Sequence, residues 1–241
     1  MNKVPTPHNG ASIKDVAPIV FLPGDPTRAA YLAGELLESP RPVNTTRNCL
    51  GYTGTYLGKR VTIQASGMGQ PSLGIYVAEL IQFYGVTDII RLGSCGVFDK
   101  NVELNSIIIC EEAITNSNIA LLNKSTEQYA LGPIAGSDKL LKKVLGVKRI
   151  DSSVQLLAGR VLASDLFYFD KKDWWKKIDP SCICVDMETF YLYCLGKSLG
   201  VDCLTLNLAV DNLETGEELP SEERVTHTIE MAEFALDSFL K

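Results

Sequence analysis

The stretch IVFLPGDPTR, residues 19–28, decides the fold class. Its first residues are apolar, as in a strand that is buried on both faces. Gly24 ends the apolar run, Asp25 is a good helix cap, and Pro26 suits the first position of a helix. The stretch therefore predicts a buried strand that turns directly into a helix, which is the repeating unit of α/β proteins.

Similar apolar runs alternate with helical patterns along the rest of the chain. A helix is expected over Pro71–Tyr84, where apolar residues recur every three to four positions up to Gly85. Another is expected after Pro220, with Ser221 as its N-cap. We expect strands at Ile19–Gly24, Val61–Gly67, Asp88–Ser94, Ser106–Ile114, Leu156–Ala163, Cys182–Met187 and Asp202–Asp211. The alternation predicts a single α/β domain over residues 1–241, with a central mixed, mostly parallel twisted sheet flanked by helices.

Composition excludes several classes of function. The 241 residues carry 23 Lys and Arg against 29 Asp and Glu, a net charge of −6, whereas a nucleic-acid-binding surface is basic. No uncharged apolar run approaches the roughly 18 residues of a membrane span. The N-terminal residues lack the apolar core of a signal peptide. We therefore expect a cytoplasmic protein with no nucleic-acid or membrane partner.

Cysteine and histidine usage narrows the chemistry. The seven cysteines contain no Cys-x-x-Cys pair, and most lie in apolar runs, so we expect neither a structural zinc nor disulfides. His8 and His227 are the two histidines, and neither lies in a recognisable motif. The sequence thus predicts no metal site and chemistry that does not depend on histidine.

Two arginines follow or end predicted strands. Arg28 lies in the first turn after the 19–24 strand, and Arg91 lies in an apolar strand that runs into Gly93 and Ser94. An arginine in a buried strand needs an anionic partner, and the carboxyl ends of parallel strands meet at one edge of a sheet. These arginines predict a shared oxyanion site, with a capped turn and a solvated Arg28 as the alternative.

Carboxylates end two further strands. Glu188, which follows Val185-Asp186-Met187, is suited to hydrogen bonding of vicinal hydroxyls, with a helix-capping acid as the alternative. Asp211 ends a long apolar strand, and such surroundings suit a general acid. An Asx turn is the alternative there. The turn Gly67-Met68-Gly69 is explained by helix packing alone.

The distinctive segments occur in a fixed order along nearly the whole chain. They are Thr6-Pro7-His8, Gly24-Asp25-Pro26-x-Arg28, Asn44-x-x-Arg47, residues 51–56, Gly67-Met68-Gly69-x-Pro71-Ser72, Ile90-Arg91-x-Gly93-Ser94-Cys95-Gly96, residues 164–168, Met187-Glu188, Asp211 and Glu223-Arg224. Together they resemble the nucleoside phosphorylase family, specifically its bacterial-type, hexameric purine nucleoside phosphorylases.

The resemblance implies a three-layer sandwich and reversible phosphorolysis of purine ribonucleosides or deoxyribonucleosides, as in purine salvage. Inorganic phosphate would be the co-substrate, with no cofactor, and active sites would be shared between subunits of a homohexamer built as a trimer of dimers. The residues implied for phosphate are Gly24, Arg28, Arg91 and Ser94, with Arg47 from a neighbouring subunit.

For the nucleoside, the resemblance implies that Glu188 holds the ribose hydroxyls, Met187 packs under the sugar, and a neighbour's His8 bonds the 5′-hydroxyl. Asp211 would protonate N7 of the purine, with Arg224 moving in to assist. The other residues implied for nucleoside binding are Met68, Cys95, Gly96, Phe167, Val185 and Asp186.

The sequence departs from the family at four of these positions or beside them. Asp186 stands where the family usually has Glu, Val210 and Asn212 flank Asp211 where Ser and His are usual, and Gln70 follows the Gly-Met-Gly turn. Base preference therefore stays open. The alternatives are a uridine phosphorylase, a nucleoside hydrolase of the same superfamily, and a catalytically silent nucleoside-binding protein.

Overall fold

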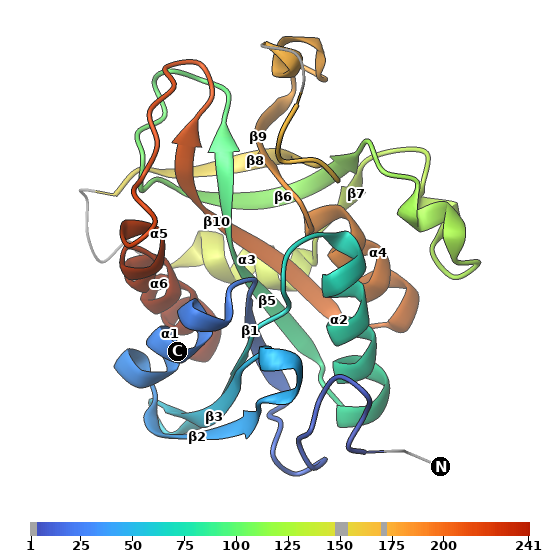
Figure 1. The fold of residues 1–241 in the computed structure, drawn as a ribbon, viewed down its shortest axis with the longest axis vertical. Coiled ribbons are helices and arrows are strands. Elements are labelled where there is room, and N and C mark those ends of the chain that lie inside the picture. The colour runs from blue at the N-terminus through green and yellow to red at the C-terminus, as the bar shows by residue number, and fades with distance from the viewer. Residues whose placement is uncertain (1–3, 148–153, 170–172) are drawn as a thin grey trace.

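The structure is a computed structural model that describes residues 4–147, 154–169 and 173–241. Within these residues a ten-stranded mixed sheet lies between helices (Figure 1). The strands are β1 (Ile19–Pro23), β2 (Glu38–Asn44), β3 (Gly51–Tyr56), β4 (Lys59–Gln64), β5 (Asp88–Val97), β6 (Ile107–Thr115), β7 (Ile134–Ala135), β8 (Leu156–Ala163), β9 (Cys182–Asp186) and β10 (Asp202–Asn212). The α-helices are α1 (Pro26–Leu36), α2 (Gln70–Tyr84), α3 (Asp138–Gly146), α4 (Thr189–Leu199), α5 (Glu223–Thr226) and α6 (Thr228–Leu240). The predicted α/β class is confirmed.

The strand pairings form two parallel blocks. Parallel pairings join β4, β1, β5 and β10, and separately β6, β8 and β9. Antiparallel pairings of β10 with β6 and of β5 with β9 connect the blocks. As a result β1, β5 and β10 end at one edge, and β9 ends there too, because Val185 pairs with Gly96. Ligands of such sheets bind beyond the carboxyl ends of the strands.

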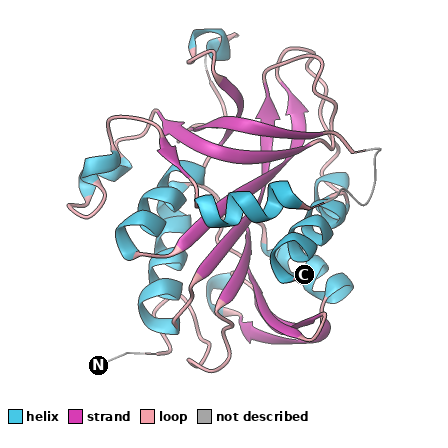
Figure 2. Ribbon diagram, turned by 180° about the vertical axis from the view of Figure 1, so that it is seen from behind, coloured by secondary structure: helices cyan, strands magenta, loops and turns pink. Residues whose placement is uncertain are grey.

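Each face of the sheet has its own apolar core. Val20 and Ile89 belong to the core under α2 and α4, whereas Phe21 and Ile90 belong to the core under α1, α3 and α6. Neighbouring residues of a strand point to opposite faces, so strands buried between two helix layers are apolar throughout. Figure 2 shows α3 lying across the far face of the sheet. The three layers match the predicted sandwich.

The helix boundaries agree with the sequence signals at two places. Helix α1 begins at Pro26, and the Asp25 side chain accepts a hydrogen bond from the Thr27 backbone N–H at 2.8 Å. Helix α2 ends at Gly85, which adopts the left-handed conformation with φ of +72°. Glycine meets that conformation without a steric cost.

The predicted N-cap at Ser221 is wrong. The helix begins at Glu223 as the short α5, and the preceding Glu222 makes no side-chain capping bond to any described residue. The Arg224 backbone N–H instead donates to the Pro220 carbonyl at 3.1 Å. The helix is interrupted at His227, and α6 begins at the next residue. Arg224 therefore stands on a four-residue helix of its own.

The hairpin of β2 and β3 was not expected from the sequence. Most residues of β2 are exposed or half-buried, so this edge of the sheet lacks the apolar signal of the central strands. All seven cysteines lie within the described residues as buried, free thiols. No helix in the described part of the chain is long and apolar enough to cross a membrane.

Candidate active site

A cavity of about 450 Å³ opens beyond the ends of β1, β5, β9 and β10. It collects most of the residues that the sequence nominated. These are Gly24, Arg28, Met68, Arg91, Ser94, Cys95, Gly96, Phe167, Val185, Asp186, Met187, Glu188, Asp211 and Arg224. Residues that are far apart in the sequence thus meet at the predicted edge of the sheet.

Arg28 is buried rather than solvated. Its side chain leaves the first turn of α1, and its Nη2 donates to the Arg224 carbonyl at 3.0 Å, while its Nε has no partner among the described residues. Burial lowers the pKa of Arg28 to about 10. A buried guanidinium with a free donor is well suited to an anionic ligand.

Arg91 is the second buried arginine of the cavity, with a side-chain exposure of 4%. Its Nη2 pairs with Glu188 Oε2, and its Nε lies 3.9 Å from Asp186 Oδ2. Its Nε and Nη1 have no hydrogen-bond partner within the described ranges. Burial acts to lower the pKa of Arg91, but the two carboxylates outweigh it and raise the pKa.

Glu188 connects Arg91 to the glycine turn before α2. Its Oε1 accepts a hydrogen bond from the Gly69 backbone N–H at 2.5 Å. Gly69 adopts φ of +83°, a conformation that favours glycine, so this turn does more than pack a helix. Burial raises the pKa of Glu188, and the nearby Arg91 opposes that shift.

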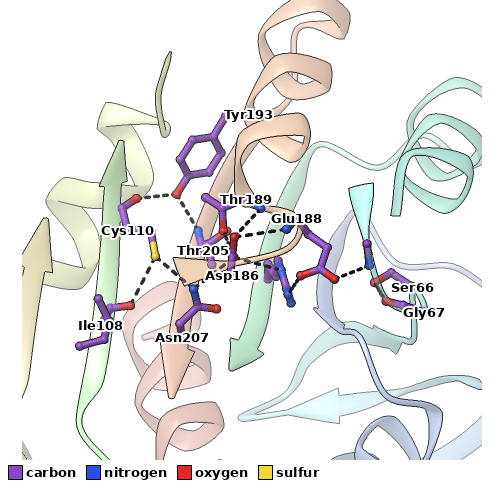
Figure 3. A network of polar contacts seen from close by, with 12 residues as sticks. Ser66, Gly67, Ile108, Cys110, Asp186, Glu188, Thr189, Tyr193, Thr205 and Asn207 are labelled. Carbon is purple, nitrogen blue, oxygen red and sulfur yellow. Dashed lines mark hydrogen bonds and ion pairs between the residues drawn. The ribbon is translucent and has the colours of Figure 1, made fainter. Parts of the chain in front are cut away.

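Asp186, not Glu188, is the helix-capping acid. One of its oxygens accepts from the backbone N–H groups of Glu188 at 3.2 Å and Thr189 at 3.3 Å. The other accepts from the Thr189 hydroxyl and from Asn207 Nδ2 (Figure 3). The two carboxylates that flank Met187 therefore differ: Asp186 is held inside the protein, and Glu188 pairs with an arginine of the cavity.

Asp211 and Arg224 form a second arginine–carboxylate pair of the cavity. The guanidinium contacts both carboxylate oxygens, at 2.5 and 3.2 Å, although the resemblance implies that Arg224 has to move to reach Asp211. The Asx-type bonds are made by the next residue, because Asn212 Oδ1 accepts from the backbone of Glu214 and Thr215. The Asp211 carboxylate is thereby left facing Arg224 and the cavity.

The outer end of the cavity is aromatic. Phe167, with a relative exposure of 60%, stands at the mouth, and Phe169 stacks on Trp174 with a centroid distance of 3.7 Å. The sequence reasoning did not nominate Trp174 or Phe169. Their signal was the cluster of aromatic residues between Phe167 and Trp175, within an otherwise charged stretch.

His8 and Arg47 are the two nominated residues that do not line the cavity within the described chain. His8 packs beside Tyr76, and the positive charge of Arg47 is close enough to influence the same tyrosine. The His8 ring meets the Tyr76 ring edge-on at 6.2 Å and bonds Glu79 at 2.7 Å. Burial raises the pKa of Tyr76, and the charge of Arg47 opposes that shift. Arg47 is exposed, with φ of +56°.

Within the described residues, no group of three or more His, Cys, Asp or Glu side chains is arranged so that it could hold a metal ion.

Sequence comparisons place this geometry among known proteins. A family model described as the Phosphorylase superfamily matches residues 18–240. Curated relatives named purine nucleoside phosphorylase DeoD-type, from Bacillus thuringiensis and Bacillus cereus, are 43% identical over 235 residues, which is 97% of this chain and 98% of each relative.

Structural comparison finds similar folds in two crystal structures of uridine phosphorylase from Vibrio fischeri. One, solved with 6-hydroxy-1-naphthoic acid, has a TM-score of 0.82 and covers 97% of this chain and 95% of that chain. The other has a TM-score of 0.83 and covers 99% and 97%. Both are 26% identical to this chain.

Proposed function

Because the chain belongs to the phosphorylase superfamily, we propose that it is a purine nucleoside phosphorylase. It cleaves purine ribonucleosides or deoxyribonucleosides reversibly with inorganic phosphate, giving the free base and the pentose 1-phosphate. One observation carries the proposal: two buried arginines with unpaired donors share a cavity with a partly exposed Asp–Arg pair.

Phosphate is proposed to bind at the buried end of this cavity. Arg28 and Arg91 supply charge and free N–H donors, and the Ser94 hydroxyl adds a donor at the end of β5. Gly24 lets the backbone pack closely against the glycine turn there, since an added Cβ would lie 3.1 Å from the Gly67 carbonyl oxygen. Holding the phosphate below the sugar orients it for attack on the anomeric carbon.

The nucleoside is proposed to lie across the rest of the cavity. Glu188 exchanges its contact with Arg91 for the ribose hydroxyls, and Met187 and Met68 pack against the sugar. The base stacks near Phe167 and rests on Val185, Cys95 and Gly96. All of these residues line the same cavity, which supports this arrangement.

Asp211 is the proposed general acid. Cleavage of the glycosidic bond develops positive charge on the sugar and negative charge on the leaving base. A proton delivered to N7 makes the base a neutral leaving group, a contribution of about 10²–10⁴-fold in rate for a well-placed acid. Asp211 gives up this proton from its neutral carboxyl form, and Arg224, which reaches both of its oxygens, stabilises the carboxylate that remains after the transfer.

His8 and Arg47 are proposed to complete the site of a neighbouring subunit. They lie outside the cavity of their own chain, with His8 against Tyr76 and the charge of Arg47 acting on the same tyrosine, and this supports a contribution of both across one interface. We propose a homo-oligomer with shared sites, a hexamer built from dimers.

Uridine phosphorylase is the second candidate, because the compared crystal structures belong to that class. The higher identity to purine-specific relatives and the acid at Asp211 favour purines. Hydrolysis is disfavoured by the two incompletely paired arginines, which an attacking water does not need. Nothing in the site favours a silent binding protein.

Initial rates test the proposal directly. The full-length chain is assayed with inosine, guanosine, adenosine and uridine, each with and without phosphate. Purine release that requires phosphate supports the proposal. Equal rates without phosphate would establish a hydrolase, turnover of uridine alone would establish the second candidate, and binding without cleavage would establish a silent protein.

A further inference from the structure

We propose that Asp186 and Asn207 form a buried positioning pair that holds Arg91 for phosphate, and that Asp186 does not contact the ribose. The inference rests on the proposed function. It also replaces the expectation that Asp186 belongs to the nucleoside-binding set.

The Asp186 side chain has no exposure, and both of its oxygens are already bonded. Two backbone N–H groups, the Thr189 hydroxyl and the Asn207 amide donate to it. A carboxylate has about four lone-pair positions, so four donors saturate it. A ribose hydroxyl would have to displace a bond that caps α4, which argues against a direct substrate contact.

Asn207 lies in β10, and its side chain is fully buried. Its Nδ2 donates to Asp186 at 3.2 Å and to Cys110 Sγ at 3.4 Å (Figure 3). Its Oδ1 has no partner among the described residues. The amide therefore turns its positive end toward a carboxylate and leaves its negative end unpaired.

Gly93 shows where that negative end lies. Asn207 pairs with Gly93 in the register of β10 and β5. A Cβ built on Gly93 would lie 2.0 Å from Asn207 Oδ1 and 2.8 Å from Arg91 Nη1. The amide oxygen and the guanidinium thus lie over the same glycine without a hydrogen bond between them, so the Asn207 amide has its donor side on Asp186 and its acceptor side near the Arg91 cation.

Two carboxylates near one arginine suit the proposed reaction. Glu188 contacts Arg91 directly, whereas Asp186 lies 3.9 Å from its Nε. When Glu188 turns to the ribose, Arg91 would lose its main counter-charge inside the protein. Asp186 stays fixed by the cap of α4 and by Asn207, and it keeps Arg91 charged and oriented while phosphate takes the free donors.

The test separates phosphate binding from nucleoside binding in the variants Asn207→Leu and Asp186→Asn. Loss of a bond to a charged group predicts a KM for phosphate that rises about 10- to 100-fold in each variant, with the KM for inosine changed by less than about threefold. The two substitutions together should cost less than the product of the separate losses, since both act through Arg91.

Inosine and 2′-deoxyinosine distinguish positioning from a direct ribose contact. A positioning role predicts the same fractional loss of kcat/KM for both nucleosides. A loss that falls on inosine and spares 2′-deoxyinosine would overturn the proposal and return Asp186 to the ribose site. An unchanged KM for phosphate in both variants would overturn it as well.

Tyr193→Phe is the matched control. The Tyr193 hydroxyl is buried in the same network, where it bonds the Cys110 carbonyl and the Thr205 N–H, but it does not reach Arg91. Its loss should lower the thermal midpoint and leave the KM for phosphate unchanged. If Asn207→Leu does not fold, Asn207→Thr, which suits a strand, takes its place.

The proposed function is checked first on the unaltered enzyme. Wild-type activity that does not depend on phosphate defeats the proposed function. Phosphate-dependent activity whose phosphate KM is insensitive to residues 186 and 207 defeats this inference alone. Calorimetric titration of inorganic phosphate into the free enzyme gives a readout that does not require turnover, and the affinity should fall by the same factor as KM rises.

Discussion

The cavity has two arginine–carboxylate pairs on different elements, and the pairs differ in burial and in the contacts that support them. Arg91 and Glu188 have side-chain exposures of 4% and 6%, whereas Arg224 and Asp211 have 25% and 16%. The first pair stands on β5 and at the start of α4, and Gly69 and Asp186 lie against it. The second lies between the end of β10 and the four-residue helix α5.

We call the side of the cavity with Arg91 and Glu188 the fixed wall, and the side with Asp211 and Arg224 the adjustable wall. A buried arginine is costly to leave without a counter-charge, so Arg91 keeps its place beside Asp186 even when Glu188 turns to the ribose, and this wall suits a small, symmetric anion. A partly exposed pair is screened by water and is held less tightly, so the Asp211 wall can open when a base enters. The proposed phosphorolysis can use both walls, because the fixed wall would position the phosphate and the adjustable wall would release the base.

Removal of the acid tests the adjustable wall and has the largest expected effect. Asp211→Asn should lower kcat for inosine about 10²–10⁴-fold, because the base then leaves without a proton. A nucleoside with an N7-methylated, positively charged base should lose far less. Equal losses on the two substrates would remove Asp211 from the acid role.

Substitution of each arginine shows how much each pair contributes to the free energy of unfolding. Arg91→Met leaves two buried carboxylates without their cation and should lower the free energy of unfolding by about 3–5 kcal/mol. Arg224→Met breaks the partly exposed pair and the bond from Nε to the Leu219 carbonyl, and should cost less than about 2 kcal/mol. Denaturant titration measures both. Similar losses would mean that the walls do not differ in rigidity.

A neighbouring subunit is proposed to supply Arg47 to the phosphate site at the fixed wall. Arg47→Ala should raise the KM for phosphate about 10- to 100-fold, as expected for a lost bond to a charged ligand, with the folding stability unchanged. Mass measurement in solution supplies the control. An active monomer with wild-type phosphate affinity would refute the shared site.

The smallest effect on activity is expected for Phe167, at the exposed end of the cavity. Phe167→Ala should raise the KM for inosine about 2- to 10-fold through the lost aromatic stacking. Its KM for phosphate and its thermal midpoint should not change, because the ring is already largely exposed. A loss of phosphate affinity in this variant would mean that the two ends of the cavity are coupled.

The central sheet and most of the cavity were predictable because their signals are local. A run such as IVFLPGDPTR contains a strand, a cap and a helix start in ten residues, and an arginine in a buried strand predicts an anionic partner. The local sequence could not identify that partner, because Arg91 pairs with Glu188, 97 positions away in the sequence. The β2–β3 hairpin was missed because its strands lack an apolar pattern.

The buried network behind Arg91 was the least predictable part. A single asparagine in the apolar run of β10 is as unusual as an arginine in β5, yet nothing local says that Asn207 meets Asp186 and Gly93. The roles of neighbouring residues were exchanged for the same reason. Asp186 rather than Glu188 caps α4, and Asn212 rather than Asp211 makes the Asx-type bonds, since orientation at a strand end depends on the partner across the sheet.

Gly93 sets the order in which this part of the protein can change during evolution. An alanine there would collide with both the Asn207 amide and the Arg91 guanidinium, so Gly93 cannot be replaced while both residues remain. Position 207 has to shrink before position 93 can grow, and Arg91 still stands in the way afterwards. A homologue can therefore gain a side chain at 93 only after both position 207 and position 91 have changed, and the same substitution would be harmful before those changes and tolerated after them.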